Sequence, residues 1–459
     1  MFASIRHIFS LPELKSKIGF TLMMLVICRF GAYIPVPGIN GDLAVQLFKA
    51  ATGGSQNLFQ LMDVFSGGAF AQMTIIALGV MPYISASIIF QLLMALIPSL
   101  QRDVKESPDQ GKRKMGKWMR VMTIGIALFQ SALFAKYALK INSGAQGIIM
   151  PEMLEFTCMG LPWLFYLTVM LTMTAGTMLL MWVGEQITEK GIGNGMSLII
   201  TTGILSSIPK ITGSIIQQLN LDSQEVGGLT FSSLAVLMTL FVMIIMGTIL
   251  VIQGQRRIPL QYARRVIGDA AQSSSQGNQP YIPLKINYAG VVPVIFASSL
   301  LMFPATIAQF MSKGIDLSTF VRLLSPGSWL HTVLYVALII FFTYFWTATQ
   351  FHPDQIASDM KKNGAFIPGV RQGKETQKHI ELVMNRMTCV GALSLALIAI
   401  LPTLITRLLG VDPNISHFFG GTSLLILVGV VLDTTKQIES HLLMKRYDGF
   451  MRNLRAKPF

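Results

Sequence analysis

The stretch NLFQLMDVFSGGAFAQMTIIALGVMPYISASIIFQ, residues 57–91, begins like a membrane-spanning helix, breaks off and begins again. Residues 58–65 are mostly apolar, but Asp63 interrupts them, Gly67 and Gly68 follow, and a continuous apolar run starts only near Thr74. A dozen helical residues extend roughly 18 Å, against about 30 Å for the hydrocarbon core of a bilayer. A short helix of this kind is tolerated at membrane depth only where protein or a water-filled cavity surrounds it. The stretch therefore predicts a short re-entrant segment beside a cavity, followed by a full span.

The composition indicates an all-α polytopic membrane protein. Hydrophobic residues make up 52% of the 459 residues, charged residues make up 13%, and the mean hydropathy is +0.56. The cysteines Cys28, Cys158 and Cys389 are too far apart in the sequence to suggest a disulfide framework or a set of metal ligands. We expect them to be small packing residues. No cleavable signal peptide is expected, because residues 1–17 form a short amphipathic stretch before a span-sized apolar run.

Ten apolar segments are predicted to span the membrane. The first five cover residues 18–34, 74–97, 121–134, 163–183 and 196–208. The second five cover residues 231–252, 288–310, 330–348, 387–405 and 422–432. The third, fifth and tenth are short, so flanking residues should extend them or a cavity should interrupt them. The chain thus divides into an amino-terminal half, 1–230, and a carboxyl-terminal half, 231–459, and paired halves are common in transport proteins.

Positive charges lie mainly on one side of these spans. Of the 36 Lys and Arg residues, 28 fall in the two termini and in the loops after spans two, four, six and eight, whereas 7 fall in the other five loops. The positive-inside rule therefore places both termini and the even-numbered loops in the cytoplasm. The formal charge of +14 belongs mostly to this face, which would also attract anionic phospholipids.

Two of the cytoplasmic loops, 253–286 and 350–386, are longer than the topology requires. The first contains Arg256, Arg257, Arg264 and Arg265, and the second contains Lys361, Lys362 and Arg371. Connections of more than thirty residues are usually functional or disordered. Since arginine pairs with carboxylates and with phosphates, both loops are candidates for docking an acidic protein or RNA. For each single cation, topology and attraction to lipid are an equal alternative.

Charged side chains are rare inside the predicted spans. Apart from Arg29, no Asp, Glu, Lys or Arg lies near the middle of a span, although proton- and sodium-coupled carriers usually need such a residue. Arg29 lies six residues before Pro35, so we expect it to snorkel at a helix end. The sequence has no His-Glu-x-x-His motif, nucleophile elbow or phosphate loop, and His331 has no evident partner. A secondary carrier of a small solute is the alternative to a channel, and a membrane-embedded enzyme is the third candidate.

Several motifs resemble the bacterial SecY family. They are FSGGA at 65–69, ALGVMPYISASI at 77–88, GEQITEK at 184–190 with the glycine run after it, FPATIA at 303–308 and FGGTSLL at 419–425. The resemblance covers nearly the whole chain in the same order. It implies ten transmembrane helices in two pseudo-symmetric halves around a central pore. It also implies a protein-conducting channel of the Sec translocon, which moves unfolded preproteins across the cytoplasmic membrane and releases membrane helices through a lateral gate. Neither enzymatic activity nor a cofactor or metal is implied.

The resemblance assigns roles to individual residues. Segment 58–72 resembles the plug of the family, represented by Leu58, Phe59, Leu61, Met62, Val64, Phe65, Gly67 and Gly68. The pore ring would consist of Val80, Ile84, Met196, Ile200, Ile295 and Ile426, which periodicity alone would assign to ordinary packing. Polar positions of the lateral gate, between spans two, three, seven and eight, are matched by Gln91, Gln130 and Asn287. Docking positions for the motor and the ribosome are matched by Arg256, Arg257 and Arg371.

The partners that the resemblance implies are the SecE and SecG subunits, the SecA ATPase, the ribosome, signal sequences and nascent chains, with SecDF and YidC as further candidates. The implied location is the bacterial inner membrane. The sequence departs from the family at Val80 and Met196, where isoleucine is common, and at 272–279, where a Ser/Gln-rich run replaces a more basic one. The second departure weakens that part of the predicted docking surface. On span two, Leu92 is expected to face lipid.

Overall fold

Each of the ten predicted spans overlaps an α-helix in the computed structural model. The structure describes residues 12–52, 58–97, 108–144, 147–155, 157–158, 161–218, 231–262, 280–311, 323, 328–409 and 422–455. The helices are α2 (Pro12–Gly31), α5 (Met81–Leu96), α7 (Pro108–Gly144), α9 (Trp163–Lys190), α10 (Gly195–Gln218), α11 (Phe231–Gln253), α12 (Val292–Met311), α14 (Trp329–Gln350), α16 (Lys374–Leu409) and α18 (Thr422–Arg455). Five stretches of the described helices are long and apolar enough to cross a membrane: Arg113–Asn142, Trp163–Lys190, Leu234–Gln253, Trp329–Lys362 and Lys374–Leu401. Shorter apolar stretches are Met81–Ala95, Gly195–Pro209 and Val292–Met302.

Two of the short predicted spans belong to much longer helices. Helix α7 has 37 residues and α18 has 34, whereas the apolar runs within them are 121–134 and 422–432. The flanking residues are rich in Lys, Arg, Gln and Met, which are good helix formers even where they are polar. Hydropathy therefore marks only the apolar part of each helix.

The second span begins later than predicted, because residues 74–80 form turns before α5. Thr74 makes an isolated antiparallel bridge with Pro35, and the Ile75 amide donates to the Ile34 carbonyl at 3.0 Å. Gly79 then adopts a φ of +57°, a left-handed conformation that prevents α5 from extending back into residues 74–78. Helix α5 starts at Met81 with Pro82 in its first turn, where the missing proline N–H costs nothing.

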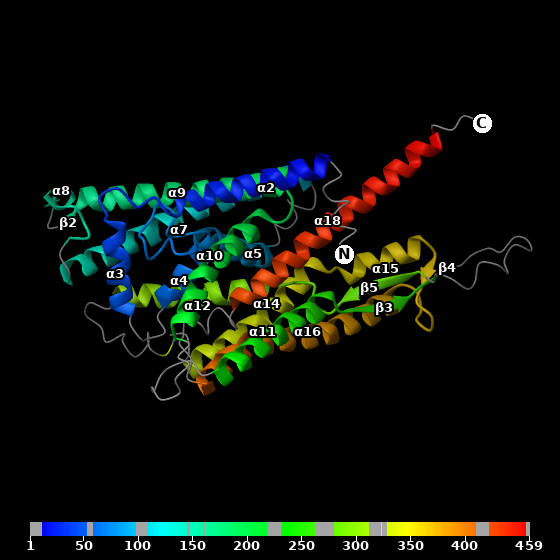
Figure 1. Ribbon diagram of the computed structural model, residues 1–459. Coiled ribbons are helices and arrows are strands. Elements are labelled where there is room, and N and C mark those ends of the chain that lie inside the picture. Colours follow the sequence, from blue (N-terminus) through cyan, green and yellow to red (C-terminus); the bar gives the residue numbers. More distant parts are fainter. Residues whose placement is uncertain are drawn as a thin grey trace, which may run out of the picture.

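The helices pack as two groups. In the first group α9 packs against α2, α7 and α10, and α5 packs against α7. In the second group α14 packs against α12 and α16, while α11 packs against α16 and α18. The two groups meet where α12 contacts α5 and α7, and where α18 contacts α10. Figure 1 shows α2, α7 and α9 on one side and α11, α14 and α16 on the other, with α18 running obliquely.

The two long basic loops fold together at one end of the helices, the right-hand end in Figure 1. Strand β3 (Gln255–Pro259) pairs antiparallel with β5 (Tyr281–Lys285), and β4 (Gln261–Tyr262) pairs with β6 (Ala365–Phe366). Helix α15 (Pro353–Lys362) packs against β6 and α16. A separate apolar cluster that includes Ile258, Leu284 and Ile380 joins these elements. Backbone pairing and this cluster therefore give the described parts of both loops a defined shape.

Short elements lie at the opposite end, the left-hand end in Figure 1. They are α3 (Gly41–Thr52), α8 (Pro151–Glu155) and the hairpin of β1 (Thr157–Cys158) and β2 (Leu161–Pro162). A second buried cluster packs this end and includes Phe70, Phe134 and Phe165. Phe70 and Phe134 meet edge to face at 5.1 Å between ring centroids, a favourable aromatic geometry.

Candidate functional site

Six apolar side chains of the predicted ring lie on helices of both groups. They are Val80 and Ile84 at the start of α5, Met196 and Ile200 on α10, Ile295 on α12 and Ile426 on α18. Five of them are 0 to 7% exposed and belong to one large buried cluster that includes residues of both groups, called the ring cluster below. Met196 is half-buried and packs against that cluster. The six residues thus belong to the core that the two helix groups share.

Close packing of α12 and α18 fixes two members of this ring. A Cβ atom at Gly429 would lie 2.3 Å from Val291 Cγ1, so only glycine allows the two chain segments to approach this closely. Gly429 lies three residues after Ile426, and Val291 lies four residues before Ile295. Residues three or four apart share one face of a helix, so the close approach places Ile426 and Ile295 at the same interface.

The short helix α4 (Leu58–Ser66) lies against both helix groups. It packs against α10 on one side and α12 on the other. Its Met62 and Phe65 side chains contact the ring cluster, and Val64 is half-buried. Gly67 and Gly68 follow with φ angles of +70° and +90°, a left-handed backbone that glycine adopts readily and that turns the chain at the end of α4. The side chains of Leu58, Phe59 and Leu61 lie outside the described part of the structure.

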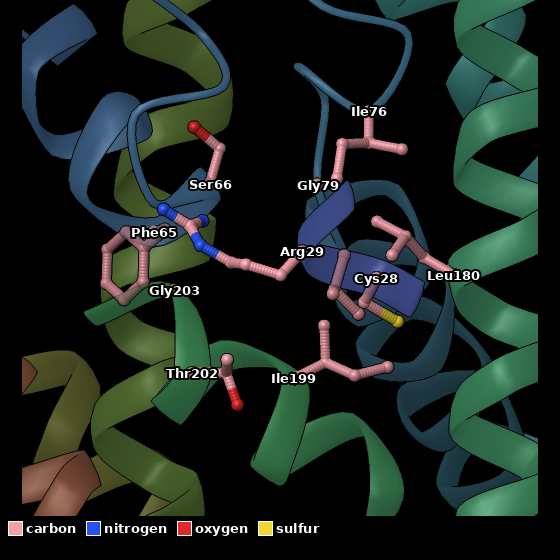
Figure 2. Close-up of a pocket in the computed structure, with 11 residues that line it drawn as sticks. Cys28, Arg29, Phe65, Ser66, Ile76, Gly79, Leu180, Ile199, Thr202 and Gly203 are labelled. Carbon is pink, nitrogen blue, oxygen red and sulfur yellow. The ribbon is translucent and has the colours of Figure 1, made fainter. Parts of the chain in front are cut away.

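Arg29 lies in the last turn of α2, as predicted, and its guanidinium has a partner that the sequence did not suggest. Its Nη2 atom donates a hydrogen bond of 2.9 Å to the Gly67 carbonyl, 38 residues away. Figure 2 shows the side chain extending from α2 to Phe65 and Ser66, at the end of α4. The same guanidinium lies 5.6 Å from the centre of the Tyr33 ring. Arg29 also borders a cavity of about 30 Å³ between α2, α4, α9 and α10, with Val80 of the ring among its other lining residues.

The three predicted gate residues share one unusual property. The side-chain oxygens of Gln91, Gln130 and Asn287 are buried and have no hydrogen-bond partner among the described residues. The amide nitrogens of two of them are used: Asn287 Nδ2 donates to the Gly290 carbonyl at 2.7 Å, and Gln91 Nε2 donates weakly to Ser87 Oγ at 3.4 Å. Buried polar atoms are nearly always paired in proteins, and of six such unpaired side-chain atoms among the described residues three belong to the predicted gate residues.

The three predicted docking arginines are exposed on the two long basic loops, 253–286 and 350–386. Arg256 and Arg257 lie on β3, and the Arg257 guanidinium lies 4.8 Å from the centre of the Tyr281 ring on β5. Arg371 follows a turn that contains Gly369, and its carbonyl accepts a hydrogen bond from Thr376 Oγ1 at 2.9 Å. β4 and β6 join the two loops directly. The Ser/Gln-rich residues 272–279 lie outside the described part.

The cysteines and histidines form no second site in the described ranges. Cys28 is buried as expected, but Cys389 is exposed on α16, so its prediction as a packing residue is wrong. The Cys158 side chain is outside the described part. His331 stacks on Tyr335 with ring centroids 6.0 Å apart. Among the described residues, no group of three His, Cys, Asp or Glu side chains is placed to hold a metal ion.

Sequence reasoning missed Ser206 on α10. Its hydroxyl lies 3.2 Å from the Gly67 carbonyl that also binds Arg29. Gly203, one turn earlier, lets α10 approach the end of α4, since a Cβ there would lie 2.8 Å from the Phe65 carbonyl. The available signal was the three-residue spacing of Ile200, Gly203 and Ser206, which continues the face that carries a ring residue.

The sequence and structure are similar to those of known proteins. A family model described as SecY matches residues 74–435. Protein translocase subunit SecY of Chlamydia trachomatis serovar D is 59% identical over 456 residues, which cover 99% of each chain. A solved structure described as a protein conducting channel has a TM-score of 0.60 at 20% identity and covers 92% of this chain and 91% of the other. A second, which concerns how the plug domain of SecY stabilises the closed state of its channel, has a TM-score of 0.59 at the same identity and coverage. Because the family model matches most of the chain and the relative is similar over its full length, the chain belongs to the SecY family.

Proposed function

We propose that the six-residue ring is the gate of a protein-conducting pore in a bacterial Sec translocase. Membership of the SecY family makes the chain a protein translocase subunit with a channel fold. The observation that carries the proposal is that six residues from four helices, all apolar, lie in or against one buried cluster that both helix groups share: Val80, Ile84, Met196, Ile200, Ile295 and Ile426. These helices come from both halves of the chain, 1–230 and 231–459. A rearrangement between the halves would therefore widen the ring.

The chemistry of the ring suits a substrate without a fixed sequence. An apolar constriction loses its water when it is empty, and this blocks ions without a polar ligand. Methionine is unbranched and flexible enough to fit around different passing side chains, and none of the six members offers a polar group that would select one sequence. The same property argues against the small-solute carrier, which needs convergent polar groups to hold its substrate. Since the sequence has no phosphate loop, the driving energy comes from a partner.

Helix α4 and the bend at 67–68 act as the plug in this proposal. The helix is too short to cross a bilayer, and it contacts α10 and α12, which belong to different halves. Its apolar face rests on the ring cluster through Met62 and Phe65. Segment 58–72 would therefore close the channel beside the ring and leave when the halves separate.

The interface of α12 with α5 and α7 serves as the lateral gate, with α14 beside it. Gln91, Gln130 and Asn287 carry the buried unpaired oxygens there. Each unpaired oxygen costs the closed state about 1–3 kcal/mol, and water or a polar ligand removes this cost once the interface opens. The closed gate is thus held less tightly than an entirely apolar interface would be.

The joined loops form the docking surface, with Arg256, Arg257 and Arg371 as cationic contacts. A SecA motor and the ribosome are the proposed partners, and the structural relative Sec61 occurs in a canine ribosome–channel complex. SecE and SecG are proposed as the small membrane partners, with SecDF and YidC as further ones. Signal sequences and nascent chains are the proposed cargo, and anionic phospholipids the proposed surroundings. The proposed location is the bacterial inner membrane with both termini in the cytoplasm.

The ring is tested by polar substitution at two of its members. Ile84→Asn and Ile426→Asn place an amide in the constriction, where it lacks partners until the ring is hydrated. Because burying such an amide costs about 1–3 kcal/mol, both variants should raise the ion leak of the resting channel by roughly tenfold. Both should also improve the export of a reporter with a defective signal sequence.

Ile89→Asn on α5 is the matched control, because Ile89 is 41% exposed and faces away from the cluster. Leu92, expected to face lipid, is instead half-buried against the ring cluster and is unsuitable as a control. If the control leaks as much as the two ring variants, the six residues do not line a gate.

A further inference from the structure

A single backbone oxygen at the end of α4 receives side-chain hydrogen bonds from two other helices. The Gly67 carbonyl lies 2.9 Å from Arg29 Nη2 of α2 and 3.2 Å from Ser206 Oγ of α10. The Ser206 hydroxyl also lies 2.7 Å from the Gly203 carbonyl of its own helix. Since a hydroxyl has one hydrogen to donate, Ser206 shares it between two acceptors, and Arg29 makes the stronger bond to Gly67.

The approach of the three segments depends on glycine. A Cβ atom at Gly67 would lie 2.6 Å from Arg29 Nη1 and 2.8 Å from both Gly203 Cα and Ser206 Oγ. The φ angle of +70° at Gly67 further disfavours any other residue. The contact therefore depends on the backbone of all three segments and is not the chance approach of a long side chain.

The charge of Arg29 matches its position. A helix ends with carbonyl groups that lack partners and with a partial negative charge, which favours a cation. Gly67 directly follows the last residue of α4, and the arginine lies there, within the first predicted span. Releasing Gly67 would leave Arg29 with the Tyr33 ring 5.6 Å away, a weaker partner than a charge-assisted hydrogen bond to a carbonyl. The carbonyl and the cation thus stabilise each other only while α4 is in place.

Hydrogen bonds connect α4 to the turn that carries Gly67. The Gly68 amide donates to the Asp63 carbonyl at 2.8 Å, and Asp63 Oδ1 accepts from the Ala71 amide at 2.8 Å. Ser66 Oγ accepts from the Phe70 amide at 3.0 Å. These bonds fix the turn that carries Gly67 relative to α4. Hydrogen bonds to the Gly67 carbonyl therefore restrain the whole of helix α4.

We propose that Arg29 and Ser206 are positioning residues that form a latch on the Gly67 carbonyl and set how readily α4 leaves the closed channel. The inference rests on the proposed function of α4 as the plug. Opening requires both donors to release the carbonyl, and α4 then moves as a unit from between α10 and α12. Arg29 contributes most of the binding energy at the Gly67 carbonyl, and Ser206 keeps that carbonyl hydrogen-bonded when the arginine moves.

The test uses the complete translocase in proteoliposomes and measures resting ion flux. Arg29→Met removes charge and donors at similar volume and should raise the flux by about tenfold or more, the range expected for a lost charge-assisted bond. Ser206→Ala should raise it by about two- to fivefold. The double variant should exceed the product of the two single effects, because only there does the carbonyl lose both donors. Arg29→Lys keeps a cationic donor and should restore part of the seal.

A second readout reports α4 itself. In a background with the three native cysteines replaced, a Val64→Cys thiol should react with a soluble reagent faster in the latch variants, in the same order as their flux. Thr202→Val is the matched control: Thr202 borders the same cavity, but its hydroxyl donates to the Leu198 carbonyl of its own helix. It should leave flux and thiol reactivity unchanged.

The outcomes separate the latch from the plug. Deleting 58–64 should raise resting flux if α4 is the plug. If the deletion leaks while Arg29→Met and Ser206→Ala do not, the latch is wrong and the plug stands. If the deletion does not leak, the plug assignment itself fails. A leak in the latch variants without faster reaction of the Val64→Cys thiol would also overturn the latch, since Arg29 would then act elsewhere. Should Arg29→Met fail to accumulate, Arg29→Lys and Ser206→Ala decide the question.

Discussion

Replacing Gln130 by methionine should make the lateral gate harder to open. Gln130 Oε1 on α7 is buried without a partner among the described residues, and α7 is one of the helices that contact α12. Methionine has a similar length and no acceptor that needs pairing, so the substitution removes a cost of about 1–3 kcal/mol from the closed state. In the open state the glutamine is hydrated and carries no such cost. At 1.4 kcal/mol per tenfold change, the closed state should gain roughly 5- to 150-fold over the open one.

The assay is the export of two reporters by inner-membrane vesicles, one with a normal signal sequence and one with a weakened signal sequence. Gln130→Met should slow the weak reporter by the stated factor and slow the normal one less, because a strong signal supplies more binding energy to the open state. The matched control is Gln253→Met, which removes the amide of an exposed glutamine on α11. Equal or faster export of the weak reporter by Gln130→Met would refute the reasoning that the unpaired oxygen destabilises the closed gate.

Two further predictions concern the loops and the topology. Arg371→Glu, or Arg256→Glu together with Arg257→Glu, should leave the amount of protein in the membrane near normal while motor and ribosome binding and export fall; a collapse in protein level would show that these exposed residues are structural. In cells, a membrane-impermeant thiol reagent added outside should modify Glu152→Cys on α8 and should not reach Lys374→Cys at the start of α16; modification of Lys374→Cys would overturn the topology inferred from the charge bias.

The helical architecture was predictable because membrane spans leave a local signal. Apolar runs located the ten described helices that overlap the predicted spans, and the interrupted apolar stretch at 58–65 correctly identified α4 as a separate short helix. The boundaries were less predictable. Polar residues of α7 and α18 continue their helices outside the apolar runs, and no hydropathy signal marks where such a helix ends.

Contacts between distant segments were not predictable from local pattern. Residues 74–80 look like the beginning of a span, but Thr74 and Ile75 are paired with residues 34–35 and leave the helical path. Likewise, nothing in either basic loop indicates that β4 pairs with β6 across more than a hundred residues.

The residues of the candidate site could be proposed from the sequence, but their interactions could not. The resemblance to the SecY family suggested the six ring residues, five of which lie in one buried cluster with Met196 packed against it. The position of Arg29 at a helix end was predictable, but its partner was not, because the sequence does not reveal a backbone carbonyl 38 residues away. Ser206 was missed because a single serine in an apolar helix most often bonds to its own backbone.

The most direct test of the central claim is whether a translocating chain touches the ring. Ile200→Cys and Ile295→Cys are each combined, in a cysteine-free background, with a secretory chain that is arrested in the channel and carries one cysteine. Both ring positions should form a disulfide with the arrested chain. Leu205→Cys and Leu300→Cys, exposed positions on the same two helices, should not. Equal cross-linking at the exposed positions, or none at the ring, would contradict passage through the ring of six.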